Sequence, residues 1–164
     1  MNLHKVGFAR RRIDWIMACL KSANLAILIN GLLTYFFKMF RGLRQSCRLS
    51  PSLFILVIGG LSKGISAAKS RGLITGCRIS RQVSISHLMF DDDVLFAGAA
   101  STDEWRAFHL VLTNFGAVSG LIMNKEKSEL IFDRLDGETE KEIASLFGVK
   151  LTVMFAGFRY LGFL

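Results

Sequence analysis

The sequence predicts an α+β protein, and three observations support that class. Apolar residues at helical spacing alternate along the chain with short runs of strand-forming residues. Turn signals typical of antiparallel hairpins separate neighbouring strand-forming runs. Apolar residues make up 51% of the 164, so the chain can bury a core, and its length suits one domain spanning residues 1–164.

The first quarter of the chain predicts a helix followed by a hairpin. Residues Phe8–Ser22 place apolar side chains at helical spacing, which indicates a helix. Two apolar runs, Leu25–Ile29 and Leu32–Phe40, flank the pair Asn30-Gly31. An Asn-Gly pair between such runs is a strong hairpin signal, because both residues tolerate the positive φ of a tight turn.

A long helix is expected to begin at Ser50-Pro51 and to run to about Lys69. Serine can cap free backbone N–H groups, and proline is preset for the first helical position. Glycines weaken the helix interior but allow another backbone to approach closely; these are Gly59, Gly60 and Gly64.

The second half predicts a hairpin with an acidic turn and then further helices and strands. Strand runs Val83–Phe90 and Val94–Ala97 enclose Asp91-Asp92-Asp93. Ser101 and Glu104 have the spacing of a capping box at the start of the next helix. The remaining expected elements are a strand at Lys127–Phe132, a helix at Glu138–Phe147 and a closing strand at Arg159–Leu164.

Charge is divided unevenly along the chain. Residues 1–85 contain 14 Lys and Arg and a single acid, Asp14, whereas residues 86–164 contain 7 Lys and Arg and 12 acids. A basic half suggests a polyanionic partner such as nucleic acid. The alternative is a solvated basic face without a partner.

The sequence favours an intracellular protein, nuclear or cytoplasmic. Its three cysteines are widely spaced and form neither a disulfide framework nor a zinc motif. Residues 1–12 lack the apolar segment of a secretory signal. The longest uncharged stretches are shorter than the roughly 20 apolar residues of a spanning helix, so no membrane partner is expected.

Three adjacent aspartates between apolar strands can bind divalent metal. Packed carboxylates repel unless a cation or hydrogen bonds neutralise them, and Mg²⁺ prefers oxygen ligands. The alternative is a solvated acidic turn. The flanking apolar strands favour metal binding over this alternative, because they hold the acids at a sheet edge.

Several segments resemble motifs of LINE-type, non-LTR reverse transcriptases, in the order in which that family has them. Phe90-Asp91-Asp92-Asp93 resembles its F-A-D-D motif. Arg41–Gln45, with Leu49-Ser50-Pro51, resembles its R-G-L-R-Q-G-D-P-L-S-P segment. The further matches are Ile29-Asn30-Gly31, Ser119-Gly120-Leu121 with Asn124 and Lys127-Ser128, and Tyr160-Leu161-Gly162, and they are most similar to plant elements.

The resemblance implies a partial palm domain of the right-hand polymerases: an antiparallel sheet with an acidic hairpin packed against helices. In the family, the matching residues bind Mg²⁺ (or Mn²⁺), RNA template, DNA primer and deoxynucleotides. By motif position, Asp92 and Asp93 match the metal pair. Gln45 matches the residue beside the incoming nucleotide, and Arg41 and Arg44 match residues near the nucleic acid. Lys127 matches a lysine that assists departure of pyrophosphate, although an ordinary exposed lysine is an equal alternative.

The sequence also departs from the family pattern. The family's first catalytic aspartate lies in a K-A-F-D-like segment, which these residues do not contain, and Asp14 matches no motif position. Asp91 stands where the motif has alanine, and Ser46-Cys47-Arg48 stands where it has G-D-P. We therefore expect a truncated reverse transcriptase palm that is inactive by itself. The alternatives are a non-catalytic nucleic-acid-binding remnant and a small membrane-associated protein, and the oligomeric state stays open.

Overall fold

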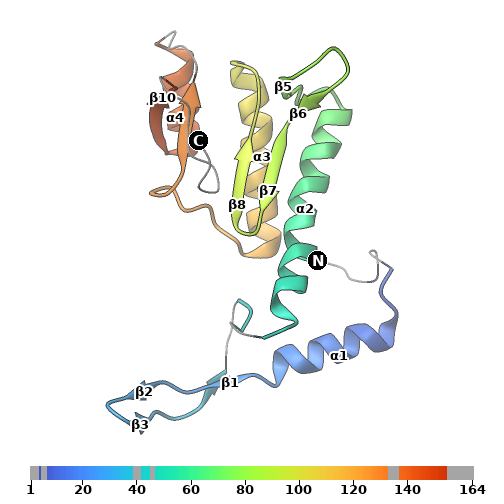
Figure 1. Cartoon of the computed structure of the whole chain (residues 1–164), viewed down its shortest axis with the longest axis vertical. Coiled ribbons are helices and arrows are strands. Elements are labelled where there is room, and N and C mark those ends of the chain that lie inside the picture. The colour runs from blue at the N-terminus through green and yellow to red at the C-terminus, as the bar shows by residue number, and fades with distance from the viewer. Residues whose placement is uncertain (1–3, 5–6, 39–41, 45–46, 133–136, 155–164) are drawn as a thin grey trace. The chain divides into compact units, whose positions relative to one another are not determined.

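The computed structural model describes residues 4, 7–38, 42–44, 47–132 and 137–154 (Figure 1). The chain divides into two compact units, Met1–Ile58 and Gly59–Leu164, and each is described by itself. Within the described part, helices mix with short two-stranded ladders, which agrees with the predicted α+β class.

The first unit consists of one amphipathic helix, a hairpin arm and the start of a second helix. Its elements are α1 (Arg10–Lys21), β1 (Asn24–Leu25), β2 (Leu28–Ile29), β3 (Leu32–Leu33), β4 (Phe37–Lys38) and the first turns of α2 (Ser50–Ser70). β1 pairs with β4 and β2 pairs with β3, both antiparallel. The predicted helix at Phe8–Ser22 is thus confirmed with slightly shorter bounds.

The predicted hairpin turn at Asn30-Gly31 is also confirmed. Asn30 has φ of 49° and Gly31 has φ of 83°, the left-handed conformation that such turns require. Ile27 and Thr34 tie the arm together, because the Ile27 N–H donates to Thr34 Oγ1 at 2.9 Å and the Thr34 N–H donates to the Ile27 carbonyl at 2.9 Å.

The start of α2 differs from the prediction in its capping. The helix begins at Ser50, so Ser50 takes the first helical position and Pro51 the second. The Ser50 hydroxyl donates to the Arg44 carbonyl at 2.6 Å instead of accepting from a free helix N–H. The reason is local: the preceding loop returns to the helix start and offers an acceptor within reach.

α2 approaches α3 (Thr102–Ser119) closely at one of the three glycines. A Cβ on Gly64 would lie 3.0 Å from Val111 Cγ1, whereas a Cβ on Gly60 would lie 3.7 Å from Phe115 and one on Gly59 would meet nothing within 4 Å. The sequence suggested close helix packing for the three glycines, and Gly64 is the one at which α2 and α3 approach this closely.

In the described part of the chain, α2 is the helix that is long and apolar enough to cross a membrane by length and composition alone. Core helices pass the same test, and α2 buries Leu61, Ile65 and Ala68. The expectation of no membrane partner stays a prediction.

The second unit adds the remaining elements around an aromatic core. They are β5 (Cys77–Arg78), β6 (Ser84–Ile85), β7 (His87–Phe90), β8 (Asp93–Phe96), α3, β9 (Glu129–Phe132), α4 (Thr139–Phe147) and β10 (Lys150–Val153). Phe108 of α3 is 1% exposed, and its ring lies 5.2 Å from Phe96 of β8 and 5.3 Å from Trp105. Trp105 also meets Phe147 of α4 edge to face at 5.9 Å.

The predicted capping box at Ser101 and Glu104 does not form. Ser101 is the N-cap residue but makes no side-chain cap bond. The Glu104 carboxylate is 5% exposed and accepts hydrogen bonds from Thr75, Gly76 and Ala99 instead. The spacing in the sequence predicted that this carboxylate caps the helix start. In the structure it instead accepts backbone N–H groups that precede the helix.

One ladder differs from the predicted antiparallel pairing, which the other ladders in the described residues show. β9 and β10 run parallel, and α4 is the connection between them. The strand at Lys127–Phe132 and the helix at Glu138–Phe147 are confirmed with shorter bounds, but the β-α-β order makes a parallel pair. The closing strand at Arg159–Leu164 lies outside the described residues.

Candidate metal-binding hairpin

The acidic turn is the tip of the β7–β8 hairpin, as predicted (Figure 1). Phe90 pairs with Asp93, so Asp91 and Asp92 form a two-residue turn and Asp93 is the first residue of β8. Asp91 has φ of 50°, a conformation that aspartate tolerates better than most residues. Asp91 is therefore not in the extended backbone conformation of the flanking strands.

All three aspartates are exposed. Within the described residues, their carboxylates make no hydrogen bond or ion pair, so their oxygens are available to solvent or to a cation. Two adjacent carboxylates are hard oxygen donors of the kind that Mg²⁺ and Mn²⁺ bind. No group of three or more His, Cys, Asp or Glu side chains suited to a metal is present in the described ranges. The donor chemistry thus fits a divalent cation, and the hairpin offers neighbouring carboxylates.

The other predicted site residues lie in segments outside the β7–β8 hairpin. Arg41 and Gln45 lie outside the described residues. Arg44 is exposed in the first unit, where its carbonyl accepts the Ser50 hydroxyl. Lys127 is exposed in the turn before β9, and its N–H donates to Asn124 Oδ1 at 3.3 Å. The roles assigned to these four residues stay predictions.

A histidine network that the sequence did not reveal anchors the hairpin to α2. The Ser62 hydroxyl lies 2.8 Å from His87 Nε2, and the Ser86 hydroxyl lies 3.0 Å from Nδ1. Partial burial, with the positive charge of Lys69 nearby, lowers the pKa of His87 from its ordinary value of 6.5. The alternation of Val83–Phe90 indicated a strand, but nothing in it identified the distant serine.

The loop before α2 contains a second feature that the sequence did not reveal. The backbone N–H of Leu49 donates to Cys47, and together with bonds from Ser50 and the charge of Arg44 it lowers the pKa of this thiol, against the opposing effect of desolvation. Cys47 stands where the similar family motif has aspartate. The Ser50 N–H donates to the backbone carbonyl of Cys47 at 3.0 Å, so Cys47 contacts the start of α2 through its main chain.

Two comparisons with known proteins show what this chain is similar to. The family model described as reverse transcriptase (RNA-dependent DNA polymerase) matches residues 2–163. An uncharacterized mitochondrial protein of Arabidopsis thaliana is 35% identical over 111 residues, which cover 66% of this chain and 88% of that protein. Because the family model spans nearly the whole chain, the protein belongs to the reverse transcriptase family of RNA-dependent DNA polymerases.

Proposed function

We propose that this chain is the palm portion of a LINE-type RNA-directed DNA polymerase. The observation that carries the proposal is the placement of two adjacent, exposed carboxylates at the tip of a paired hairpin, in a chain of the reverse transcriptase family. In this function, a primer 3′ end attacks an incoming deoxynucleotide while RNA serves as the template.

Asp92 and Asp93 are the residues that would hold Mg²⁺ or Mn²⁺. Two such ions, when bound, stabilise the attacking and leaving oxygens of an in-line phosphoryl displacement. The β7–β8 ladder fixes the backbone that carries the carboxylates, since Phe90 pairs with Asp93 and the two-residue turn lies between them. A fixed ligand pair binds a cation with less loss of conformational entropy than a disordered acidic loop does.

Basic side chains and one amide would bind the nucleic acid, the incoming nucleotide and the departing pyrophosphate. Arg41 and Arg44 would hold the template and primer, and Gln45 would lie against the incoming nucleotide. Lys127 would donate a proton to the departing pyrophosphate or stabilise its negative charge. These roles rest on motif position, and the exposure of Arg44 and Lys127 is compatible with them.

We further propose that these 164 residues do not extend a primer by themselves. Asp14 is the one acid before Asp91 in the sequence, and it lies in α1 within 3.6 Å of the Arg10 guanidinium. It matches no motif position of the family. A two-metal site that lacks a shared ligand loses most of its activity, because both ions depend on that ligand.

Primer extension on an RNA template, with Mg²⁺ or Mn²⁺, tests the proposal in two arms. The chain alone should incorporate no deoxynucleotide. The same chain fused to an upstream segment that carries the family's K-A-F-D-like aspartate should incorporate, and Asp92→Asn should abolish that gain. Incorporation by the chain alone that Asp92→Asn removes would refute the proposed inactivity. A fused protein whose incorporation survives Asp92→Asn would refute the assignment of the metal pair.

The charge distribution favours a second candidate function, a nucleic-acid-binding protein without catalysis. The 14 Lys and Arg in residues 1–85 would then bind phosphates, and the aspartates would have no role. Under this alternative, Asp93→Ala leaves nucleic-acid binding unchanged, and the fused protein described above shows no metal-dependent incorporation.

A further inference from the structure

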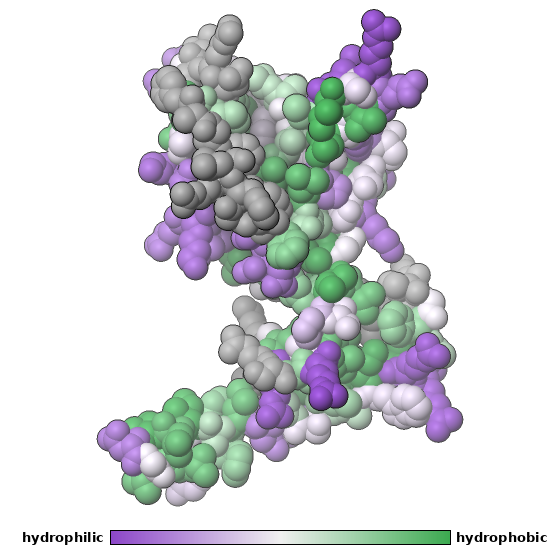
Figure 2. Space-filling model, viewed as in Figure 1, coloured by the Kyte–Doolittle hydropathy of each residue, from purple (hydrophilic) through white to green (hydrophobic). Residues whose placement is uncertain are grey.

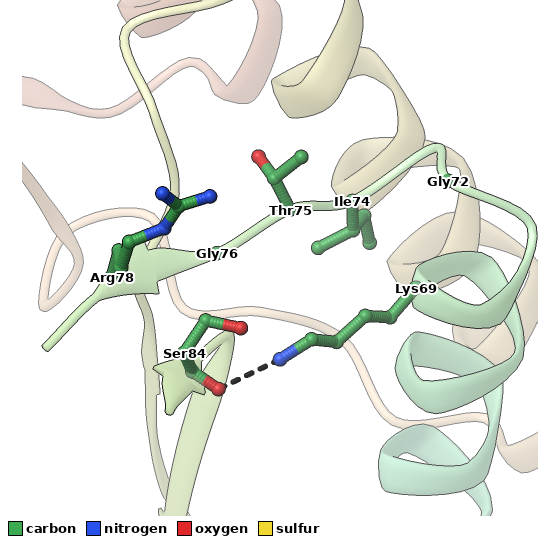
Figure 3. A pocket seen from close by; sticks show the side chains of 7 residues that line it. All are labelled: Lys69, Gly72, Ile74, Thr75, Gly76, Arg78 and Ser84. Carbon is green, nitrogen blue, oxygen red and sulfur yellow. Dashed lines mark hydrogen bonds between the residues drawn. The ribbon is translucent and has the colours of Figure 1, made fainter. Parts of the chain in front are cut away.

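A basic corner lies at the C-terminal end of α2, where the β5–β6 hairpin meets the helix (Figure 1). We define this corner by four cations, Lys69, Arg71, Arg78 and Arg81. Lys69, Arg78 and their neighbours line an open hollow of about 480 Å³ (Figure 3). Figure 2 shows strongly hydrophilic side chains projecting at this part of the molecule.

The corner has a fixed backbone. Lys69 Nζ donates to the Ser84 carbonyl at 2.7 Å, which joins α2 to β6 (Figure 3). Arg78 pairs across the ladder with Ser84. Gly76 has φ of +77°, and a Cβ there would lie 2.6 Å from the Ile85 carbonyl oxygen, so the two strands approach as closely as glycine allows.

The three arginines of the corner lack acidic partners in the described part of the chain. The ion pairs found there involve Arg10 and Arg106, and Arg71, Arg78 and Arg81 make none. All three are exposed, and no acid occurs in the sequence between Asp14 and Asp91. Unpaired cations at a rigid edge create a positive potential that attracts anions.

The basic corner is separate from the acidic turn. Figure 1 shows the β5–β6 hairpin and the turn of β7–β8 at opposite ends of the β7–β8 ladder. β7 has four residues, which span about 13 Å in an extended strand. An anion at the corner therefore lies beyond direct contact with a cation at Asp92 and Asp93.

We propose that the basic corner is a second nucleic-acid contact, which binds the phosphate backbone without reading sequence. The corner offers several cations spread over the end of a helix and a hairpin, which suits successive phosphates better than one small anion. Phosphate contacts by Arg and Lys give affinity without sequence information. This inference does not depend on metal chemistry at the acidic turn.

The test is the binding of a fluorescein-labelled oligo(U) RNA, measured by anisotropy in EDTA over a series of salt concentrations. EDTA removes divalent metal, so failure of the proposed polymerase function would not affect the result. The test variant is Arg71→Gln/Arg78→Gln/Arg81→Gln, in which Lys69 and its bond to Ser84 are kept. The control is Lys125→Gln/Lys141→Gln/Lys150→Gln, which removes the same charge from exposed sites away from the corner.

The arginine variant should bind more weakly by about tenfold or more at moderate salt. Its slope of log Kobs against log salt should be shallower by about 0.7 for each phosphate of the single strand that the variant no longer neutralises. The control should change much less in both quantities. An Arg→Lys version of the same triple should retain most of the slope, which guards against an effect of misfolding. The inference is overturned if the two glutamine triple variants lose the same RNA affinity. It is also overturned if the wild-type chain does not bind the RNA, or if its binding does not depend on salt.

Discussion

The Ser62 hydroxyl lies 2.8 Å from His87 Nε2, and this contact joins the middle of α2 to the first residue of the strand that leads into the acidic turn. The second ring nitrogen of His87 is engaged by Ser86 at 3.0 Å. A neutral imidazole has one donor and one acceptor nitrogen, so both contacts suit the uncharged ring.

Protonation of His87 should destabilise the fold at mildly acidic pH. Burial and Lys69 lower the pKa of the folded-state imidazole below 6.5, so the unfolded chain takes up the proton first as pH falls. The contribution to stability is complete above about pH 6.5 and is lost as pH falls from there through the lower folded-state pKa. Urea unfolding of the wild type and of His87→Gln, at about pH 5 and about pH 7.5, checks this. An unchanged pH dependence in His87→Gln would contradict the assignment.

Glu104→Gln should destabilise the protein by about 1–3 kcal/mol. The carboxylate accepts the N–H of Gly76 at 2.8 Å and the Thr75 hydroxyl at 2.7 Å, and an amide NH₂ group cannot accept at one of its two positions. The matched control is Glu142→Gln, because Glu142 makes an exposed ion pair with Arg106. That change should cost less than about 1 kcal/mol. Equal losses of unfolding free energy in the two variants would show that the buried carboxylate has no special role.

Gly59→Ala and Gly64→Ala should have different effects on the same helix. Alanine favours a helix interior by about 0.5–1 kcal/mol over glycine, and a Cβ at position 59 meets nothing within 4 Å. At position 64 the new methyl group would lie 3.0 Å from Val111, so packing against α3 should cancel or exceed the gain. Thermal unfolding should therefore give a higher Tm for Gly59→Ala than for Gly64→Ala, and the reverse order would contradict the close helix approach.

The β2–β3 hairpin should promote self-association. Leu28 and Leu33 face each other across this ladder and are 66% and 68% exposed. Exposed apolar patches of this kind favour association. Leu28→Thr/Leu33→Thr should lower light scattering at high protein concentration, whereas Val118→Thr/Ile122→Thr, at other exposed apolar positions, should lower it less. An equal decrease in light scattering in both double variants would show that association depends on exposed apolar surface in general and not on this hairpin.

The sequence predicted those features that depend on neighbours along the chain. The Asn30-Gly31 turn, the acidic turn before Asp93 and α4 all follow from residues within a few positions. Features that need a distant partner could not be predicted in this way. Glu104 has the spacing of a capping box, but Thr75 and Gly76 are brought to it only by the fold.

The same distinction applies to the candidate site. The pairing of Phe90 with Asp93 places the acidic turn at the hairpin tip, where local alternation predicted it. The parallel pairing of β9 with β10 depends on how α4 packs, which strand alternation does not encode. Ser62, the partner of His87, was missed for the same reason, because it lies 25 residues away along the chain.

The central claim is that Asp92 and Asp93 together hold a divalent cation. The most direct measurement is a titration of the ¹⁵N-labelled chain with Mn²⁺, followed by paramagnetic broadening of its amide signals. We predict that the amides of residues 90–94 broaden first, that Asp92→Asn/Asp93→Asn removes this broadening, and that Asp91→Asn keeps most of it. Broadening that begins at other acids such as Glu138 and Glu142, or that persists in the double variant, would contradict the claim.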